Sequence, residues 1–506
     1  MFLSLSFWLF VLLFLAVRYY ILPWIRNHNI RNIRGPALAA FSNLWLLYYC
    51  RKGKRYLAVD EAHKKYGTLV RIQPNHVSIA DDEAINSIYG HGNGFLKSYF
   101  ICSDYYDAFV SIRRGLFNTR DRAEHTRKRK IVSHTFSMKS VVQFEQYMLN
   151  NLEIFLSQWN RLSNLARGDY CRIDALPWLN YLAFDIIGDL AFGAPFGMLE
   201  KGEDVAEIRV SPDAPPSYAS AIDVINRRGE VSGTLGCLPS LIPYAKYIPD
   251  SFFTKGVESI GKLAGIAIAR VKERLANAQN IDRVDLLARL MEARDENGEK
   301  LGREELTAEA LTQLIAGSDT TSNTSCALLF HTLKSPEVVS KLQKELDEAL
   351  PEPGVPTYQL IKDLTYLDSV IKETMRVHST SSLGLPRVVV GDGLTLNDHF
   401  FPAGTVLSIP SYTIHHSKKI WGEDADDFRP ERWTTLTERQ KKAFIPFSFG
   451  PRACVGRNVA EIEMALIAST IFRNFEFQLE QDVLETREGF LRKPLFLKVG
   501  MRKRKI

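Results

Sequence analysis

The stretch Phe447-Ser448-Phe449-Gly450-Pro451-Arg452-Ala453-Cys454-Val455-Gly456 lies near the C-terminus and offers one thiol in a tight loop. Its glycines and its proline bend the backbone and let it approach a large, flat partner. Apolar residues recur at helical spacing from Arg457 to Phe472, which places Cys454 just before a helix. Free N–H groups and the helix dipole favour a thiolate there, and Arg452 adds a cation. A cysteine in a turn can also be merely a small buried residue.

The pattern F-x-x-G-x-R-x-C-x-G resembles the haem-binding loop of the cytochrome P-450 superfamily, the haem-thiolate monooxygenases. In that superfamily the cysteine thiolate is the axial iron ligand and favours cleavage of the O–O bond. The resemblance implies that Cys454 ligates the iron of haem b, and that Phe447 and Arg452 belong to the haem site. It also implies the cytochrome P-450 fold, which is mainly α with small β-sheets.

Length and composition favour one large catalytic unit. The 506 residues contain no Ser/Gly-rich linker, no low-complexity tract and no internal repeat, so we expect a single catalytic domain over residues 41–506. The six cysteines are scattered without a C-x-x-C pair, which argues against a disulfide framework or a zinc site and favours a reducing compartment. The net charge of +6 is modest and gives no case for nucleic-acid binding.

The N-terminus predicts a transmembrane signal anchor over residues 1–25, followed by a juxtamembrane linker over 26–40. Phe2 to Val17 carries no charge, and a helix of about 17 residues reaches ~26 Å, close to the ~30 Å hydrocarbon core. A cleaved signal peptide is the alternative, but it would need a basic start and a small-residue cleavage site. Aromatic and basic residues follow on one side only, which predicts a single-pass protein of the endoplasmic reticulum membrane with its catalytic domain in the cytoplasm: Arg18, Tyr19, Tyr20, Trp24, Arg26, Arg31 and Arg34.

Most of the region from Asp81 to Arg376 is predicted to be helical, with polar residues between the helices. Alternating patterns predict four short strands, at Leu69–Gln73, Val77–Ile79, Leu394–Leu396 and Val406–Ile409. The proline-containing segment from Asp204 to Tyr218 predicts a loop.

The segment from Asp121 to Phe136 predicts a basic helix on which His125 and Arg129 share a face. On composition alone it is a solvated basic helix. The resemblance implies that Arg129 contacts a haem propionate, with His125 where tryptophan is usual, and that Arg387 in Leu385-Pro386-Arg387 contacts the second propionate. Three further charges could dock an acidic electron donor: Arg127, Lys128 and Lys130.

A long helix is predicted from Thr307 to Leu333, and it contains Ala316-Gly317-Ser318-Asp319-Thr320-Thr321. Gly317 costs ~1 kcal/mol relative to alanine in mid-helix, and neighbouring hydroxyls compete for backbone carbonyls. Together they predict a local widening that makes room for a small molecule; a packing face rich in small residues is the alternative. The motif is similar to the superfamily's oxygen-activation motif, which implies that Thr320 and Asp319 manage the protons of dioxygen activation.

Glu373 and Arg376 lie in an E-x-x-R pattern and share one helix face. Such a pair is common and says little alone. In the superfamily it joins a later arginine, and Arg432 in Phe428-Arg429-Pro430-Glu431-Arg432-Trp433 is the matching residue. The resemblance implies a buried structural triad that could fix the loop carrying the thiolate.

Segments outside the haem motifs look like the subfamily of fungal benzoate 4-monooxygenases: residues 115–121, 180–189, 226–232 and 485–494. Tyr99 to Ser103 departs from the subfamily pattern as an apparent insertion in a loop that overlies the substrate in the superfamily. Thr380, Ser381 and Ser382 occupy a segment that faces the substrate there. Which residues bind the substrate carboxylate is left open, although a buried carboxylate needs a cation or several donors.

The resemblance predicts para-hydroxylation of benzoate, or of a related small aromatic acid, with O2 and electrons from NADPH passed by NADPH–cytochrome P-450 reductase. Two alternatives stay open. The same chemistry could act on another aromatic acid, a terpenoid or a fatty acid. A membrane-tethered haem sensor without turnover is the other, and it would have no use for the Asp319–Thr320 pair.

Overall fold

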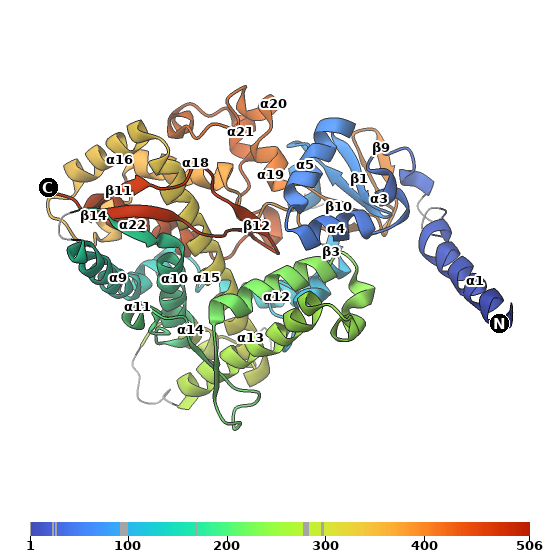
Figure 1. Cartoon of the computed structure of the whole chain (residues 1–506), viewed down its shortest axis with the longest axis horizontal. Helices are drawn as coiled ribbons and strands as arrows, with labels where there is room; N and C mark the ends of the chain where they lie inside the picture. The colour runs from blue at the N-terminus through green and yellow to red at the C-terminus, as the bar shows by residue number, and fades with distance from the viewer. Residues whose placement is uncertain are drawn as a thin grey trace.

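Helix α15 (Arg303–Leu333) runs through the middle of the molecule, and helices from both halves of the chain pack around it (Figure 1). The computed structural model describes residues 2–22, 25, 28–91, 100–166, 169–276, 283–294 and 298–505. The most extensive contacts of α15 are with α10, α13, α22 and α18. The predicted mainly helical fold with small sheets is confirmed.

The α-helices are α1 (Phe2–Ala16), α3 (Ala37–Phe41), α4 (Leu44–Lys52), α5 (Arg55–Tyr66), α6 (Ala84–Tyr89), α7 (Arg122–Ser133), α8 (Met138–Val141), α9 (Glu145–Leu165), α10 (Ala175–Phe192), α11 (Met198–Lys201), α12 (Ala221–Leu235), α13 (Ser251–Ala276), α14 (Leu286–Glu292), α15, α16 (Pro336–Ala349), α17 (Tyr358–Ile361), α18 (Thr365–Val377), α19 (Ser411–His415), α20 (Lys418–Trp421), α21 (Glu438–Ala443) and α22 (Arg457–Asn474). The strands are β1 (Leu69–Gln73), β2 (His76–Ile79), β3 (Phe100–Cys102), β4 (Cys171–Asp174), β5 (Ala206–Ile208), β6 (Ser217–Ala219), β7 (Arg387–Val389), β8 (Leu394–Leu396), β9 (His399–Phe401), β10 (Val406–Ser408), β11 (Phe475–Leu479), β12 (Thr486–Glu488), β13 (Arg492–Pro494) and β14 (Lys498–Lys503).

The largest sheet has the strand order β1-β2-β10-β7-β3 and joins the N-terminal part of the chain to the segment after α18. β10 runs parallel to β2, and the other neighbours are antiparallel. All four predicted strands are present, and the last ends one residue early, at Ser408. The predicted loop at 204–218 is wrong in part, because β5 and β6 form a hairpin there and the three prolines lie between its strands.

The described part of the apparent insertion is an edge strand. Tyr99 lies outside the described residues, whereas Phe100 to Cys102 forms β3, which pairs with β7. Cys102 stands opposite Arg387 in this pairing. The segment therefore extends the five-stranded sheet beside a residue that the sequence assigns to the haem site.

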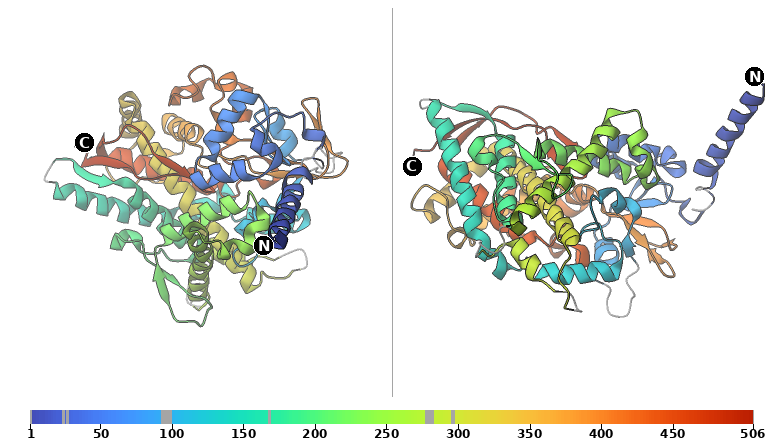
Figure 2. Two further views of the ribbon diagram at one scale, coloured as in Figure 1. Left: turned by 45° about the vertical axis from the view of Figure 1, so that its right-hand side comes forward. Right: turned by 90° about the horizontal axis from the view of Figure 1, so that it is seen from below.

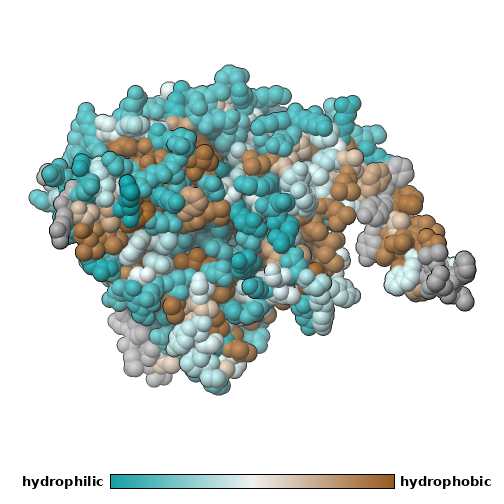
Figure 3. All heavy atoms as spheres, in the orientation of Figure 1, coloured by the Kyte–Doolittle hydropathy of each residue, from teal (hydrophilic) through white to brown (hydrophobic). Residues whose placement is uncertain are grey.

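The N-terminal helix α1 projects away from the body of the molecule (Figures 1 and 2). It is followed directly by the π-helical turn η1 (Val17–Ile21). Apolar side chains cover its surface (Figure 3), among them the exposed Phe7, Trp8, Phe10 and Phe14. Over the described ranges, no helix combines the length and the apolar character needed to cross a membrane.

Parts of the predicted anchor lie outside the described residues. Trp24 and Arg26 are among them, as are the side chains of Tyr19 and Tyr20.

Candidate functional site

The loop before α22 is a tight turn that requires glycine. Gly450 has φ +73°, and a Cβ there would lie 1.8 Å from the backbone oxygen of Tyr89, so a larger residue would move the loop. The backbone N–H of Cys454 donates to Phe447 O at 2.8 Å, which closes the turn. Helix α22 begins at Arg457, so the predicted place of Cys454 just before a helix is confirmed.

The Cys454 side chain is exposed, but it lies within the molecule, where burial raises the pKa of its thiol. The backbone N–H of Gly456 and the guanidinium of Arg129 lower the pKa again, but less than burial raises it. A bound metal ion would hold the sulfur as a thiolate at neutral pH.

Four basic residues named from the sequence are close enough to affect one another. Burial, together with the charges of Arg452, Arg129 and Arg387, lowers the pKa of His125 to about 3. The loop and α7 are joined directly, because Arg129 Nη1 donates to Ala453 O at 2.6 Å.

The hydrogen bonds of Arg129, Arg387 and Arg452 go to uncharged oxygens. Arg452 Nη1 donates to Thr119 O at 2.7 Å, and Arg387 Nη1 donates to the hydroxyl of Tyr106 at 2.6 Å. Within the described ranges, none of the three forms an ion pair with a carboxylate. Positive groups gathered beside a thiol fit a cofactor that carries a metal ion and carboxylates, and haem with its two propionates is such a cofactor.

Helix α15 is an uninterrupted α-helix from Arg303 to Leu333, so the expected widening does not appear as a break in it. A Cβ at Gly317 would lie 2.6 Å from Ile187 Cδ1, which shows that Gly317 allows α10 to pack closely. The packing alternative is thus the better account of this glycine. The expected competition for carbonyls is confirmed at Thr320, whose hydroxyl donates to Ala316 O at 2.6 Å.

Asp319 has a partner that sequence reasoning missed. Its Oδ2 lies 2.5 Å from Nζ of Lys493 on β13, and Lys493 also donates to the side-chain oxygen of Asn226 on α12. Lys493 and Asn226 both lie in stretches that resemble the benzoate 4-monooxygenases. The resemblance outside the haem motifs was the signal that could have indicated a role for Lys493. Its pairing with Asp319 depends on the fold and follows from no local sequence pattern.

The predicted triad is confirmed, and it reaches the thiol loop through a histidine. Arg376 contacts both oxygens of Glu373, at 2.8 and 2.9 Å, and Arg432 Nε lies 2.9 Å from Oε1. Arg376 Nη1 also donates to His415 O at 2.8 Å. His415 Nε2 accepts a hydrogen bond from the backbone N–H of Ile445 at 3.0 Å. Ile445 lies two residues before Phe447, where the thiol loop begins.

Burial alone would raise the pKa of Glu373, but Arg376 and Arg432 outweigh it and hold that pKa below its usual range. The triad is therefore charged and buried, which suits a structural brace.

The structure bears on two further expectations. Lys128 does not suit a docking surface, because it is buried and bonded to Glu305 and Glu309. Thr380 is half-buried and its hydroxyl lies 3.1 Å from that of Thr324, one turn after Thr320 on α15. Ser382, in contrast, is buried and donates to the backbone of Ser379.

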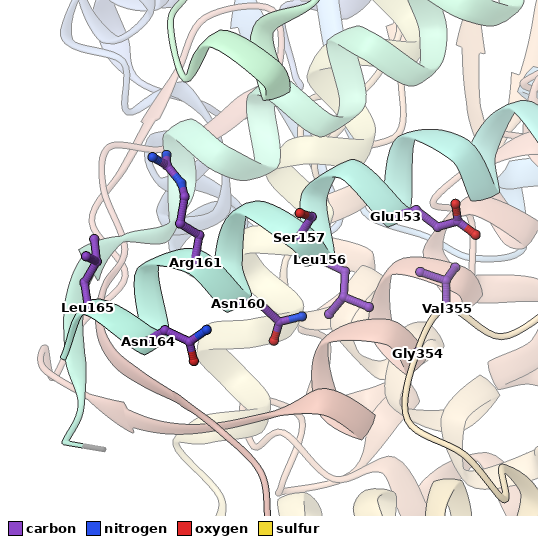
Figure 4. Close-up of a pocket in the computed structure, with 9 residues that line it drawn as sticks. All are labelled: Glu153, Leu156, Ser157, Asn160, Arg161, Asn164, Leu165, Gly354 and Val355. Atoms are coloured by element: carbon purple, nitrogen blue, oxygen red, sulfur yellow. The ribbon is translucent and has the colours of Figure 1, made fainter. Parts of the chain in front are cut away.

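One hollow on the surface holds none of the predicted site residues. It is lined by one face of α9 and the loop before α17 (Figure 4): Glu153, Leu156, Ser157, Asn160, Arg161, Asn164, Leu165, Gly354 and Val355. Its lining contains neither a thiol nor a cluster of cations. This hollow therefore gives no reason to move the candidate site away from the thiol loop and α15.

Haem is a cofactor that needs both a ligand for iron and cations for two carboxylates, so the fold and this site define a haem-thiolate protein. The family model described as Cytochrome P450 matches residues 34–501, and the chain belongs to the cytochrome P450 family. The family's cofactor is a cysteine-ligated haem, reduced by electrons from NAD(P)H through a reductase.

The chain is 63% identical over 501 residues to benzoate 4-monooxygenase bphA of Aspergillus niger, with 97% of this chain and 96% of that protein covered. It is 31% identical to a cytochrome P450 monooxygenase of Penicillium roqueforti, covering 90% of each chain. A cytochrome P450 monooxygenase of Aspergillus terreus is 29% identical, covering 95% of this chain and 97% of its own.

Proposed function

We propose that this chain hydroxylates benzoate at the para position to give 4-hydroxybenzoate. The observation that carries the proposal is the 63% identity, over nearly the full length, to a benzoate 4-monooxygenase. The reaction consumes O2, NADPH and one proton, places one oxygen atom in the para C–H bond, and releases the other as water. The two electrons come from NADPH through NADPH–cytochrome P450 reductase.

Each site residue has a role in this proposal. Cys454 ligates the haem iron, and Arg129 and Arg387 hold the two propionates with support from Arg452 and His125. The bound haem supplies the redox chemistry that activates O2. What supports these roles is the convergence of the cations around His125 and the bond from Arg129 to the loop that carries Cys454.

Thr320 and Asp319 deliver the protons that O–O cleavage consumes. Thr320 holds its hydroxyl on the open side of α15, next to the exposed Ala316. Asp319 holds its carboxylate in the ion pair with Lys493. A proton that moves along this pair reaches α15 beside Thr320, which makes Lys493 a third member of the proposed proton route.

The proposed location is the endoplasmic reticulum membrane, with the catalytic domain on the cytoplasmic side. The projecting apolar helix α1 supports it, together with the basic residues that follow. Deletion of residues 1–33 should release the protein from microsomal membranes into the soluble fraction. Unchanged sedimentation with the membranes would rule out this segment as the anchor.

The main test is a spectrum followed by a product assay. The full-length protein, reduced and exposed to CO, should show the Soret band of a thiolate-ligated haem, and Cys454→Ser should lose it. Cys171→Ser is a matched control, because this half-buried thiol lies on β4. With reductase and NADPH, the wild-type protein should convert benzoate into 4-hydroxybenzoate. Benzoate consumption without that product would overturn the proposal in favour of another aromatic acid or another substrate class.

A further inference from the structure

Arg228 is a buried arginine on α12 whose hydrogen-bonding capacity is mostly unused. Its residue is 5% exposed. Nη2 donates to the backbone oxygen of Phe109 at 2.8 Å, whereas the buried Nε has no acceptor among the residues that the structure describes. A guanidinium offers five N–H groups, and leaving buried donors unpaired is costly.

The charge of Arg228 is also unbalanced. Other buried arginines have carboxylate partners, such as Arg376 with Glu373 and Arg55 with Glu488. Over the described ranges, no carboxylate forms an ion pair with Arg228.

Burial is the main reason that the pKa of Arg228 is lowered to about 10, and Asp319 is the acid that most opposes this shift. Asp319 is itself paired with Lys493 at 2.5 Å. Two cations and one carboxylate therefore leave one positive charge in excess.

The surroundings of Arg228 are aromatic. Its guanidinium carbon lies 5.1 Å from the ring centre of Phe109. The Phe109 ring contacts Phe117 at 5.8 Å and Phe490 at 4.8 Å, and Phe117 contacts Phe490 at 5.2 Å. Phe117 and Phe490 are only partly buried. These rings come from the segment before α7 and from the β12–β13 hairpin.

The site of proposed chemistry lies next to this cluster. The negative charge of Asp319, which precedes Thr320 on α15, acts to raise the pKa of Arg228. Asn226, two residues earlier on α12, accepts a hydrogen bond from Lys493. A ligand held at Arg228 would therefore lie close to the residues assigned to proton delivery.

We propose that Arg228 binds the carboxylate of the aromatic-acid substrate, with the aromatic ring of the substrate packed against Phe117 and Phe490. The inference rests on the proposed function and names the residue that selects an aryl carboxylate over a neutral aromatic compound. An arginine is well suited to this task because its planar group pairs with a carboxylate through two parallel bonds. The substrate supplies the missing anion and uses the free N–H groups.

The test compares a charged ligand with a neutral one of the same shape. Binding of benzoate and of benzamide to the full-length haem-loaded protein is measured by equilibrium dialysis and by the shift of the haem absorbance. The variants are Arg228→Met, Arg228→Lys and the control Arg227→Met, whose exposed side chain pairs with Asp223. The reduced CO spectrum checks that each variant retains its haem site.

Arg228→Met should weaken benzoate binding by about a hundredfold, as expected for removing one partner of a buried charge pair, and should change benzamide binding less than about threefold. Arg228→Lys should restore part of the benzoate affinity, and Arg227→Met should match the wild-type protein. Equal losses for both ligands would reduce Arg228 to a structural role, and unchanged benzoate binding would also overturn the inference. If either of these two outcomes occurs while the wild-type protein still makes 4-hydroxybenzoate, only this inference fails. A wild-type protein that neither binds nor hydroxylates benzoate overturns the proposed function and this inference together.

Discussion

The ammonium group of Lys493 lies 2.5 Å from the carboxylate of Asp319, so the β12–β13 hairpin is joined to the middle of α15. Both side chains are largely buried, at 15% and 8% exposure. The pair orients Asp319 toward the hairpin, while the Thr320 hydroxyl bonds back to its own helix. The acid and the hydroxyl assigned to proton delivery therefore have separate partners in this structure.

Lys493→Met should lower the stability of the enzyme and weaken the coupling of NADPH oxidation to product formation. It leaves the Asp319 carboxylate buried without its partner, which costs about 3 kcal/mol, and it removes the proposed first step of proton delivery. The measurements are the thermal unfolding midpoint and the ratio of product to NADPH consumed. Lys493→Arg should keep most of both, and Lys498→Met is the control, because Lys498 is exposed on β14. A normal ratio in Lys493→Met would remove the lysine from the proton route.

Thr320→Ala should separate NADPH oxidation from product formation. A positioned proton-transfer group contributes about 10²–10⁴-fold, and water can replace part of this, so we expect at least a tenfold fall in product per NADPH with hydrogen peroxide released instead. Ser318→Ala is a matched control, because Ser318 also donates to a carbonyl four residues earlier, Leu314 O at 2.7 Å. Equal coupling in the two variants would contradict the role of Thr320.

Arg129→Met should make the protein lose haem faster. Arg129 joins α7 to the thiol loop through Ala453 O, and in our proposal it also pairs with a propionate. Losing a hydrogen bond to a charged group costs about 1.5–3 kcal/mol, so haem transfer to apomyoglobin should speed up by at least about tenfold. Arg122→Met, at an exposed position on the same helix, should not change the rate. An unaltered rate in Arg129→Met would mean that the propionate contact is absent.

The thiol loop and the triad could be predicted from the sequence because each depends on residue types at short, fixed spacings. Gly450, Cys454 and the start of α22 are local features, and Glu373 with Arg376 lies on one helical turn. The ion pair between Asp319 and Lys493 joins residues 174 positions apart, and no local pattern encodes it.

Burial explains the remaining errors. The basic run on α7 predicts a solvated face, but Lys128 turns inward to two carboxylates of α15. Gly317 suggests an opening in the helix, yet the approach of Ile187 from α10 is what requires a glycine there. Both facts depend on which element packs against α15. Composition and helical periodicity do not contain that information.

Glu463 on α22 gives a pH-dependent prediction. Burial raises its pKa from 4.5 to about 8. The carboxyl also accepts a hydrogen bond from the hydroxyl of Thr321 at 3.1 Å, which opposes this shift only in part. Between these two pH values the folded protein binds a proton that the unfolded chain has released. Stability therefore falls as pH rises through this range, by at most about 1.4 kcal/mol per pH unit, and levels off above about pH 8.

Glu463→Gln keeps the shape of the side chain and removes this ionisation. The variant should match the wild-type unfolding midpoint near pH 5 and exceed it increasingly toward pH 8, because glutamine stays neutral in both states. Glu461→Gln is the control on the same helix, since Glu461 forms a partly exposed pair with Arg457 that contributes little. Unfolding midpoints of the two variants and the wild-type protein across this range provide the measurement. An advantage of Glu463→Gln that does not grow with pH would show that the Glu463 carboxyl is already ionised in the folded protein at neutral pH.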